Sequence, residues 1–163
     1  MSAAPLIDIA RAAQIIDERD GKYVSRKLLR NKGQAIAVVS DAVDDEPYVS
    51  SKIGPMLKLR DEACGGLEFC QRITGSEHVL VMTYNSHTDQ TPRSPGPSGG
   101  LRVVKIRGGY PAEPRINKLN LGACRKLIVG AGALIHFYRA VTRRIRQASV
   151  FLTVAGNCVA NPM

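Results

Sequence analysis

The sequence predicts an α+β fold in a single compact domain of 163 residues. Two observations support this prediction. Apolar residues recur at helical spacing near the beginning of the chain and again in its last third, whereas several runs between them are short, apolar and β-branched, as buried strands are. The expected arrangement is N-terminal helices, a small mixed sheet and a long basic C-terminal helix.

The first helix is expected over Leu6–Arg19, because its apolar residues recur every three or four positions. Asp20-Gly21 predicts a break, and a second helix is expected over Val24–Asn31. The second helix is basic and follows a glycine-containing turn, so the pair also fits half of a helix-turn-helix motif. The acidic residues just before it would repel DNA phosphates unless they face away.

The middle of the chain predicts strands alternating with helices. Ala35–Val39 and His78–Tyr84 are apolar and rich in β-branched residues, which favours buried strands. Between them we expect a weak helix over Lys52–Arg60 and a second helix over Leu67–Ile73. Gly75 closes the second of these helices.

The remaining elements follow a long Pro/Gly-rich stretch, Asn85–Gly100, which predicts a loop of functional or mobile character. Leu101–Arg107 is expected to be a strand. An amphipathic helix is expected over a segment that includes Phe137–Gln147. Ser149–Val154 is expected to be a last strand. All of these elements are assigned to one domain, 1–163, with the basic segment at 101–163.

The charge of the chain is concentrated in that last segment. Residues 101–163 hold eleven Lys/Arg and one acid, Glu113, whereas residues 1–100 hold twelve Lys/Arg and thirteen Asp/Glu. The formal net charge of +9 therefore arises in the last third. Such an imbalance is typical of a surface that meets a polyanion, most often nucleic acid.

The strongest candidate contacts lie on the predicted C-terminal helix. Arg139, Arg143 and Arg146 are spaced by four and three residues and share one face, which His136 extends backwards. Guanidinium groups bind phosphate in a bidentate manner, so this row can follow a nucleic-acid backbone. The full set of predicted nucleic-acid contacts is Arg102, Lys105, Arg107, Arg125, Lys126, Arg139, Arg143, Arg144 and Arg146.

The sequence therefore favours a non-enzymatic nucleic-acid-binding protein, with DNA and RNA both open. The alternative is a structural subunit of a virion or other oligomeric assembly, and a small hydrolase comes third. Partners are expected to be nucleic acid and further copies or other subunits, with no membrane. The four cysteines form no tight framework and no secretory signal begins the chain, which favours an intracellular, cytoplasmic location.

Three weaker patterns do not change this interpretation, and no cofactor, metal or catalytic residue is expected. The run around Gly130 and Gly132 is similar to a dinucleotide-binding turn, but Ile135 replaces its third glycine and no acid follows Glu113. Cysteine and histidine spacings from Cys64 onward match no common zinc module. The adjacent hydroxyl, imidazole and carboxylate of 85–89 are more typical of turn chemistry than of a catalytic triad.

Overall fold

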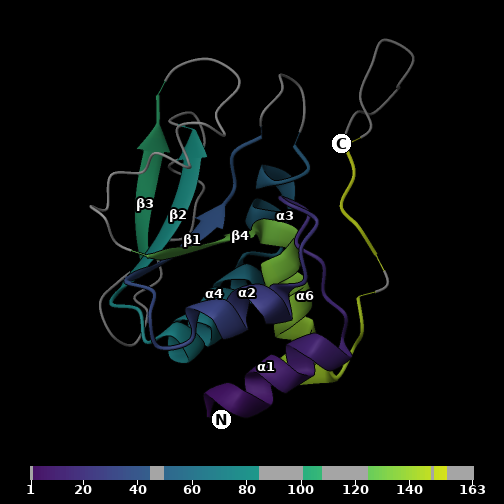
Figure 1. Cartoon of the computed structure of the whole chain (residues 1–163). Helices are drawn as coiled ribbons and strands as arrows, with labels where there is room; N and C mark the ends of the chain where they lie inside the picture. Colours follow the sequence, from purple (N-terminus) through teal and green to yellow (C-terminus); the bar gives the residue numbers. More distant parts are fainter. Residues whose placement is uncertain (1, 45–49, 85–100, 108–124, 148, 154–163) are drawn as a thin grey trace.

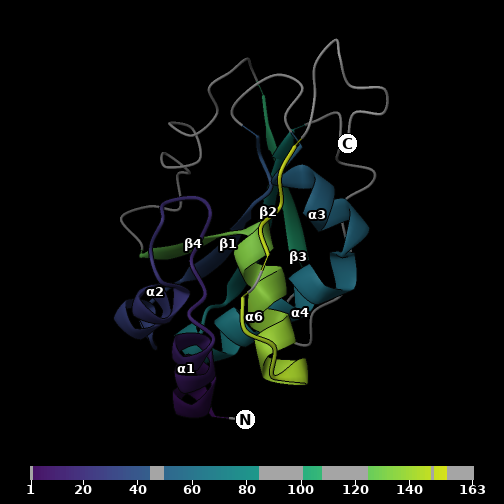
Figure 2. The same ribbon diagram turned by 90° about the vertical axis from the view of Figure 1, so that its right-hand side faces the viewer.

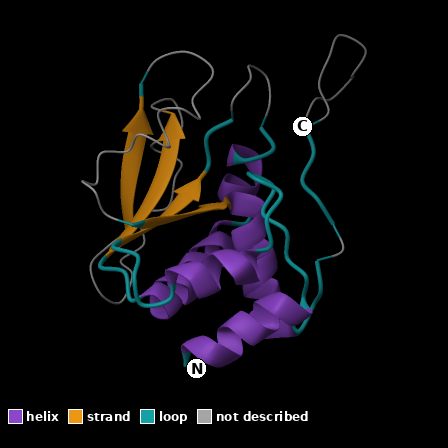
Figure 3. Cartoon of the chain, viewed as in Figure 1, coloured by secondary structure: helices purple, strands orange, loops and turns teal. Residues whose placement is uncertain are grey.

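The structure is a computed structural model that describes residues 2–44, 50–84, 101–107, 125–147 and 149–153. It contains a four-stranded sheet with helices packed along one side (Figures 1 and 3). The described helices and strands are α1 (Ala3–Ala12), α2 (Val24–Asn31), β1 (Ala37–Asp41), α3 (Ile53–Lys58), α4 (Arg60–Thr74), β2 (His78–Tyr84), β3 (Leu101–Ile106), β4 (Lys126–Gly130) and α6 (Ala131–Arg143).

The sheet has the strand order β3-β2-β1-β4, and each of its three pairings is parallel. The predicted combination of helices and strands in one compact fold is confirmed, with a C-terminal helix as expected. The sheet itself differs from the prediction of a mixed sheet. Helices α3 and α4 carry the chain from the end of β1 back to the beginning of β2, and such a crossover makes the two strands parallel.

The main core lies between the sheet and the helices. Val38, Val81 and Leu127, from three strands, belong to one buried cluster with residues of α4 and α6. Figure 2 shows α6 lying across the sheet, with α4 beside it. Helices α4 and α6 approach closely at Gly66 of α4, where an added Cβ would lie 2.3 Å from the carbonyl oxygen of Leu134 in α6. Glycine at this position therefore lets the two helix backbones approach each other closely.

A second apolar cluster lies on the opposite face of the sheet. It follows from the alternation of side chains along each strand, since the residues next to the main-core positions point the other way. The cluster consists of Ala37, Val39, Val43, Leu80, Met82 and Ile106. Both faces of the central strands are therefore apolar, which explains why their sequences are continuous apolar runs rather than alternating ones.

Several boundaries differ from the sequence prediction, whereas α2 and β2 have the predicted bounds. Helix α1 ends at Ala12, well before Arg19, and Gln14 beyond it has φ +53°. Helix α6 ends at Arg143, because Arg144 has φ +58°. Residues 149–153 form no strand, and the predicted loop Asn85–Gly100 lies outside the described residues. Within the described ranges, no helix has the length and apolar character needed to cross a bilayer.

Candidate nucleic-acid interface

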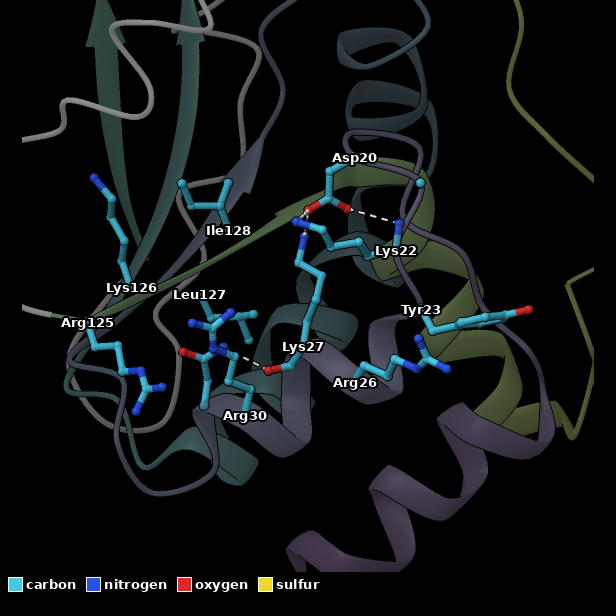
Figure 4. A pocket seen from close by; sticks show the side chains of 12 residues that line it. Asp20, Lys22, Tyr23, Arg26, Lys27, Arg30, Arg125, Lys126, Leu127 and Ile128 are labelled. Carbon is cyan, nitrogen blue, oxygen red and sulfur yellow. Dashed lines mark hydrogen bonds and ion pairs between the residues drawn. The ribbon is translucent and has the colours of Figure 1, made fainter.

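A cleft of about 580 Å³ lies between helix α2 and strand β4 (Figure 4). Most of its ionisable side chains are cationic, and we call it the basic cleft. Its charged lining residues are Asp20, Lys22, Arg26, Lys27, Arg30, Arg125 and Lys126. Tyr23, Asn31, Leu127 and Ile128 complete most of the wall. Six basic side chains and a single carboxylate make this surface strongly attractive to anions.

Helix α2 presents its basic residues to the cleft because its other face is buried. Val24 and Leu28, four residues apart, are fully buried in the main core. Arg26 and Arg30 are also four residues apart and are exposed. Among the described residues, neither guanidinium has a carboxylate partner, and Arg26 lies over the Tyr23 ring at 5.5 Å. Their charges are therefore available to a ligand.

The acidic residues that precede α2 are held by the protein itself. Asp17 is fully buried, forms an ion pair with Lys27, and accepts a hydrogen bond from the Gly130 backbone N–H at 3.1 Å. Asp20 lies within 3.3 Å of the Lys27 ammonium and 3.7 Å of the Lys22 ammonium. Burial opposes ionisation of Asp20, but the attraction of Lys27, the hydrogen bond from the Lys22 backbone N–H and the charge of Lys22 together outweigh it and lower the pKa of Asp20. The negative charge is thus compensated locally.

The Glu18 carboxylate lies against the first turn of helix α6, at the carboxyl ends of β1 and β4. Its two carboxylate oxygens accept hydrogen bonds from the backbone N–H groups of Gly132 at 2.7 Å and Ala133 at 2.9 Å. A dinucleotide-binding fold places pyrophosphate at a strand-to-helix turn of this kind. The glycine-rich run is confirmed as a close strand-to-helix turn, and here its free N–H groups are satisfied by a carboxylate of the same chain.

The predicted contact residues fall into three separate groups. Arg125 and Lys126 lie in the basic cleft, where the exposed Arg125 guanidinium donates a hydrogen bond to the Gln34 side chain. Arg102, Lys105 and Arg107 are exposed on or just after β3. Since β3 and β4 are the two outer strands of the sheet, these two groups are on opposite edges.

The third group belongs to α6 and the residues that follow it. The Arg139 guanidinium lies 2.6 Å from one oxygen of Glu62, and the Arg143 guanidinium lies 3.1 Å from the other. Both are therefore paired inside the protein with an acid that the sequence analysis did not single out. Arg144 and Arg146 follow and are exposed.

The prediction that His136 extends this arginine row is wrong. His136 is only 5% exposed and faces inward, with its ring 5.7 Å from that of Phe151. Burial lowers the pKa of His136 below its ordinary value of 6.5, and the charge of Arg139 lowers it further, against the opposing effects of a hydrogen bond with the Ser149 backbone and of the Glu62 charge. The neutral ring is therefore favoured in the folded protein.

This lowered pKa gives a pH dependence of stability. Below pH 6.5 the unfolded chain binds a proton at His136 that the folded protein does not, so the unfolding free energy falls as the pH falls below 6.5. We expect a His136→Gln variant to lose this component. Thermal unfolding of both proteins across this pH range measures the difference between them. A difference that does not change with pH would contradict the prediction.

The residues of α2 that line the cleft were not among the predicted contacts. The four-residue spacing of Arg26 and Arg30 is visible in the sequence. The net charge of this part of the sequence is nevertheless low, because acidic residues directly precede the helix. The structure separates the two sets by turning Asp17 inward. The helix-turn-helix hypothesis, which did include these residues, is wrong because residues 13–23 separate α1 from α2, far more than its tight turn.

The two described cysteines are not activated as nucleophiles. Burial raises the pKa of Cys64 to about 11 and that of Cys70 to about 12, so both thiols stay protonated at neutral pH. Among the residues that the structure describes, no three His, Cys, Asp or Glu side chains gather as a metal site would require. The segment 85–89, with its hydroxyl, imidazole and carboxylate, lies outside them.

Comparison with known proteins identifies a similar fold but no family. No protein-family model matches the chain, and no curated protein sequence is similar to it. Among solved structures, the fold is similar to one chain of an NAD⁺-reducing nickel–iron hydrogenase in the H₂-reduced state, with a TM-score of 0.56 and 9% sequence identity. The match covers 86% of this chain and 31% of the hydrogenase chain. At this identity the likeness concerns the fold alone.

Proposed function

We propose that the protein binds nucleic acid without catalysing a reaction, and that the basic cleft is its principal contact surface. The observation that carries this proposal is the convergence of basic side chains from α2, the segment before it and the beginning of β4 on one cleft, in which Lys22 and Lys27 are paired with Asp17 and Asp20 whereas Arg26 and Arg30 have no carboxylate partner among the described residues. The cleft joins Arg125 and Lys126, from the basic last third, to a basic helix near the beginning of the chain. Neither segment forms this surface alone.

The chemistry of the cleft suits phosphate groups. Arg26 and Arg30 are exposed and lie about one helical turn apart, so both side chains start from the same face of α2. A guanidinium fork matches two phosphate oxygens, and each neutralised phosphate releases condensed counterions from the nucleic acid. Binding through such contacts is expected to weaken steeply as salt is added.

The arginines at the end of α6 are proposed as a secondary contact. Arg144 and Arg146 are exposed and extend the basic surface beyond the helix end. To bind a phosphate, Arg139 and Arg143 have to leave Glu62 or divide their hydrogen bonds between Glu62 and the phosphate. This reduces what they contribute to binding. We therefore rank the basic cleft above this group.

The test is a binding measurement on two charge-matched triple variants. Replacement of Arg26, Arg30 and Arg125 by Gln removes three charges from the basic cleft. Replacement of Arg102, Lys105 and Arg107 by Gln removes three charges from the opposite sheet edge. We expect the cleft variant to bind a labelled oligonucleotide more weakly and to reduce the slope of log affinity against log salt by about one unit per lost contact.

The sheet-edge variant is expected to retain most of the affinity, and melting temperatures check that both variants remain folded. Equal losses in the two variants would show that only total charge matters. A loss confined to the sheet-edge variant would move the interface to β3. Wild-type protein that binds no oligonucleotide at low salt would end the proposal.

A second candidate function is that of a subunit in a larger assembly. The supporting observation is a set of exposed apolar side chains near the end of the described chain: Ile145 is 47%, Val150 68% and Leu152 77% exposed. Exposed apolar groups that lie close together in the chain are typical of contact surfaces. Size-exclusion chromatography before and after nuclease treatment separates the candidates, because a large particle free of nucleic acid favours assembly.

A further inference from the structure

A second hollow, of about 500 Å³, adjoins the basic cleft and shares Tyr23 with it. Its lining carries no charged side chain, and we call it the neutral hollow. It is lined by Gln14, Ile16, Tyr23, Gln147, Ser149 and Val150. Two side-chain amides and a hydroxyl therefore lie among apolar groups on one side of Tyr23, and the basic cleft lies on its other side.

Tyr23 is firmly placed at the boundary between these two surfaces. It precedes α2, its backbone pairs with that of Ile16, and the next residue donates a backbone hydrogen bond to Ile15 at 2.9 Å. Its side chain points away from Lys27 and Arg30, with the Arg26 guanidinium beside the ring (Figure 4). The residue remains 40% exposed, so part of the ring is accessible to a ligand.

The walls of the neutral hollow are also held in place. The Gln147 side-chain oxygen accepts a hydrogen bond from the Ile16 backbone N–H at 2.6 Å, which ties the segment after α6 to the segment before α2. The Gln147 backbone N–H reaches the Ala13 carbonyl at 3.3 Å. The Gln147 amide nitrogen, with the exposed side chains of Gln14 and Ser149, is positioned to exchange hydrogen bonds with a polar ring.

We propose that the nucleic acid bound by this protein is single-stranded, and that one base enters the neutral hollow against Tyr23. The proposal rests on the proposed function, since it requires the phosphates beside that base to lie in the basic cleft. A nucleotide unit combines a charged phosphate with an uncharged, flat, hydrogen-bonding base, and the two adjoining surfaces have those two characters. In a duplex the bases are paired and stacked and cannot enter such a hollow, whereas a single strand offers them freely.

The test compares three ligands of equal length: a labelled single-stranded oligonucleotide, its duplex, and a strand with the same backbone but no bases. Wild-type protein is expected to bind the single strand more tightly than either of the others. Tyr23→Leu is expected to weaken binding of the single strand by about tenfold or more, as the loss of one stacked base does, and to leave the baseless strand unaffected. Tyr23→Phe keeps the ring and is expected to retain the affinity.

Arg30→Gln serves as the matched charge variant and is expected to weaken all three ligands. Baseless and normal strands that bind equally well to wild type would overturn the proposal while leaving phosphate binding in place. Preferential duplex binding would overturn it as well. If Tyr23→Leu weakens the baseless strand equally, Tyr23 only positions Arg26 and the proposal is wrong. Absence of binding to every ligand would instead refute the proposed function itself.

Discussion

Replacement of Asp17 by Ala is expected to lower the free energy of unfolding by about 3–5 kcal/mol, the range found when one partner of a buried ion pair is removed. Asp17 is fully buried and accepts hydrogen bonds from the backbone N–H groups of Gly130 and Arg19. It also forms an ion pair with Lys27, whose side chain is only 13% exposed. The variant leaves that ammonium with Asp20 as its remaining carboxylate partner and leaves two N–H groups without an acceptor.

Chemical denaturation of the variant against wild type measures this loss. The matched control is Asp8→Ala, because Asp8 also pairs with a cation, Arg11, but both side chains are more than half exposed. An exposed pair of this kind contributes about 0.2–1 kcal/mol. Similar small losses in the two variants would show that Asp17 does not organise the segment before α2.

Gly66→Ala is expected to destabilise the protein by about 1–3 kcal/mol, even though alanine favours helices more than glycine does. The new Cβ would lie 2.3 Å from the Leu134 carbonyl oxygen and 2.8 Å from its carbon. These are backbone atoms of α6, so the contact is relieved only by moving the two helices apart. That movement loosens the packing of the main core, which α4 and α6 share with the sheet.

Gly54→Ala is the control, since Gly54 is also helical but has space around it. Its nearest atom would be the Ser50 side-chain oxygen at 3.7 Å, an ordinary contact distance. This control is expected to change stability by no more than about 1 kcal/mol in either direction, because alanine has the higher helix propensity whereas the following Pro55 disfavours a helical residue that carries a Cβ. Thermal unfolding of both variants gives the comparison, and equal effects would contradict the close contact between α4 and α6.

Elements with a strong local signal were predictable from sequence. Helix α2 and strand β2 have their predicted bounds because the pattern of apolar residues in each is short, clear and ended by a turn residue. The parallel sheet was not predictable in the same way. β1 pairs with β4 although about half of the chain lies between them, with Ala37 opposite Lys126, and the sequence shows neither that pairing nor its direction.

The candidate site was only half visible for a related reason. Arg125 and Lys126 were predicted as contacts from the charge of the last third, but their neighbours in the basic cleft come from the first third. Counting residues hides the charge of α2, because Asp17, Glu18 and Asp20 precede it. Only the fold shows that these carboxylates are bound by Lys27, by the Gly130 backbone and by the beginning of α6.

The bond between Glu18 and the first turn of α6 has a consequence for how the chain folds. The two partners are separated by 114 residues in the sequence. The bond therefore closes a very long loop, and contacts of this separation are made slowly because the ordering entropy is lost before they can form. During synthesis, helix α6 emerges more than a hundred residues after the carboxylate that caps it. The hydrogen bonds that complete its first turn must therefore wait until Gly132 and Ala133 have left the ribosome.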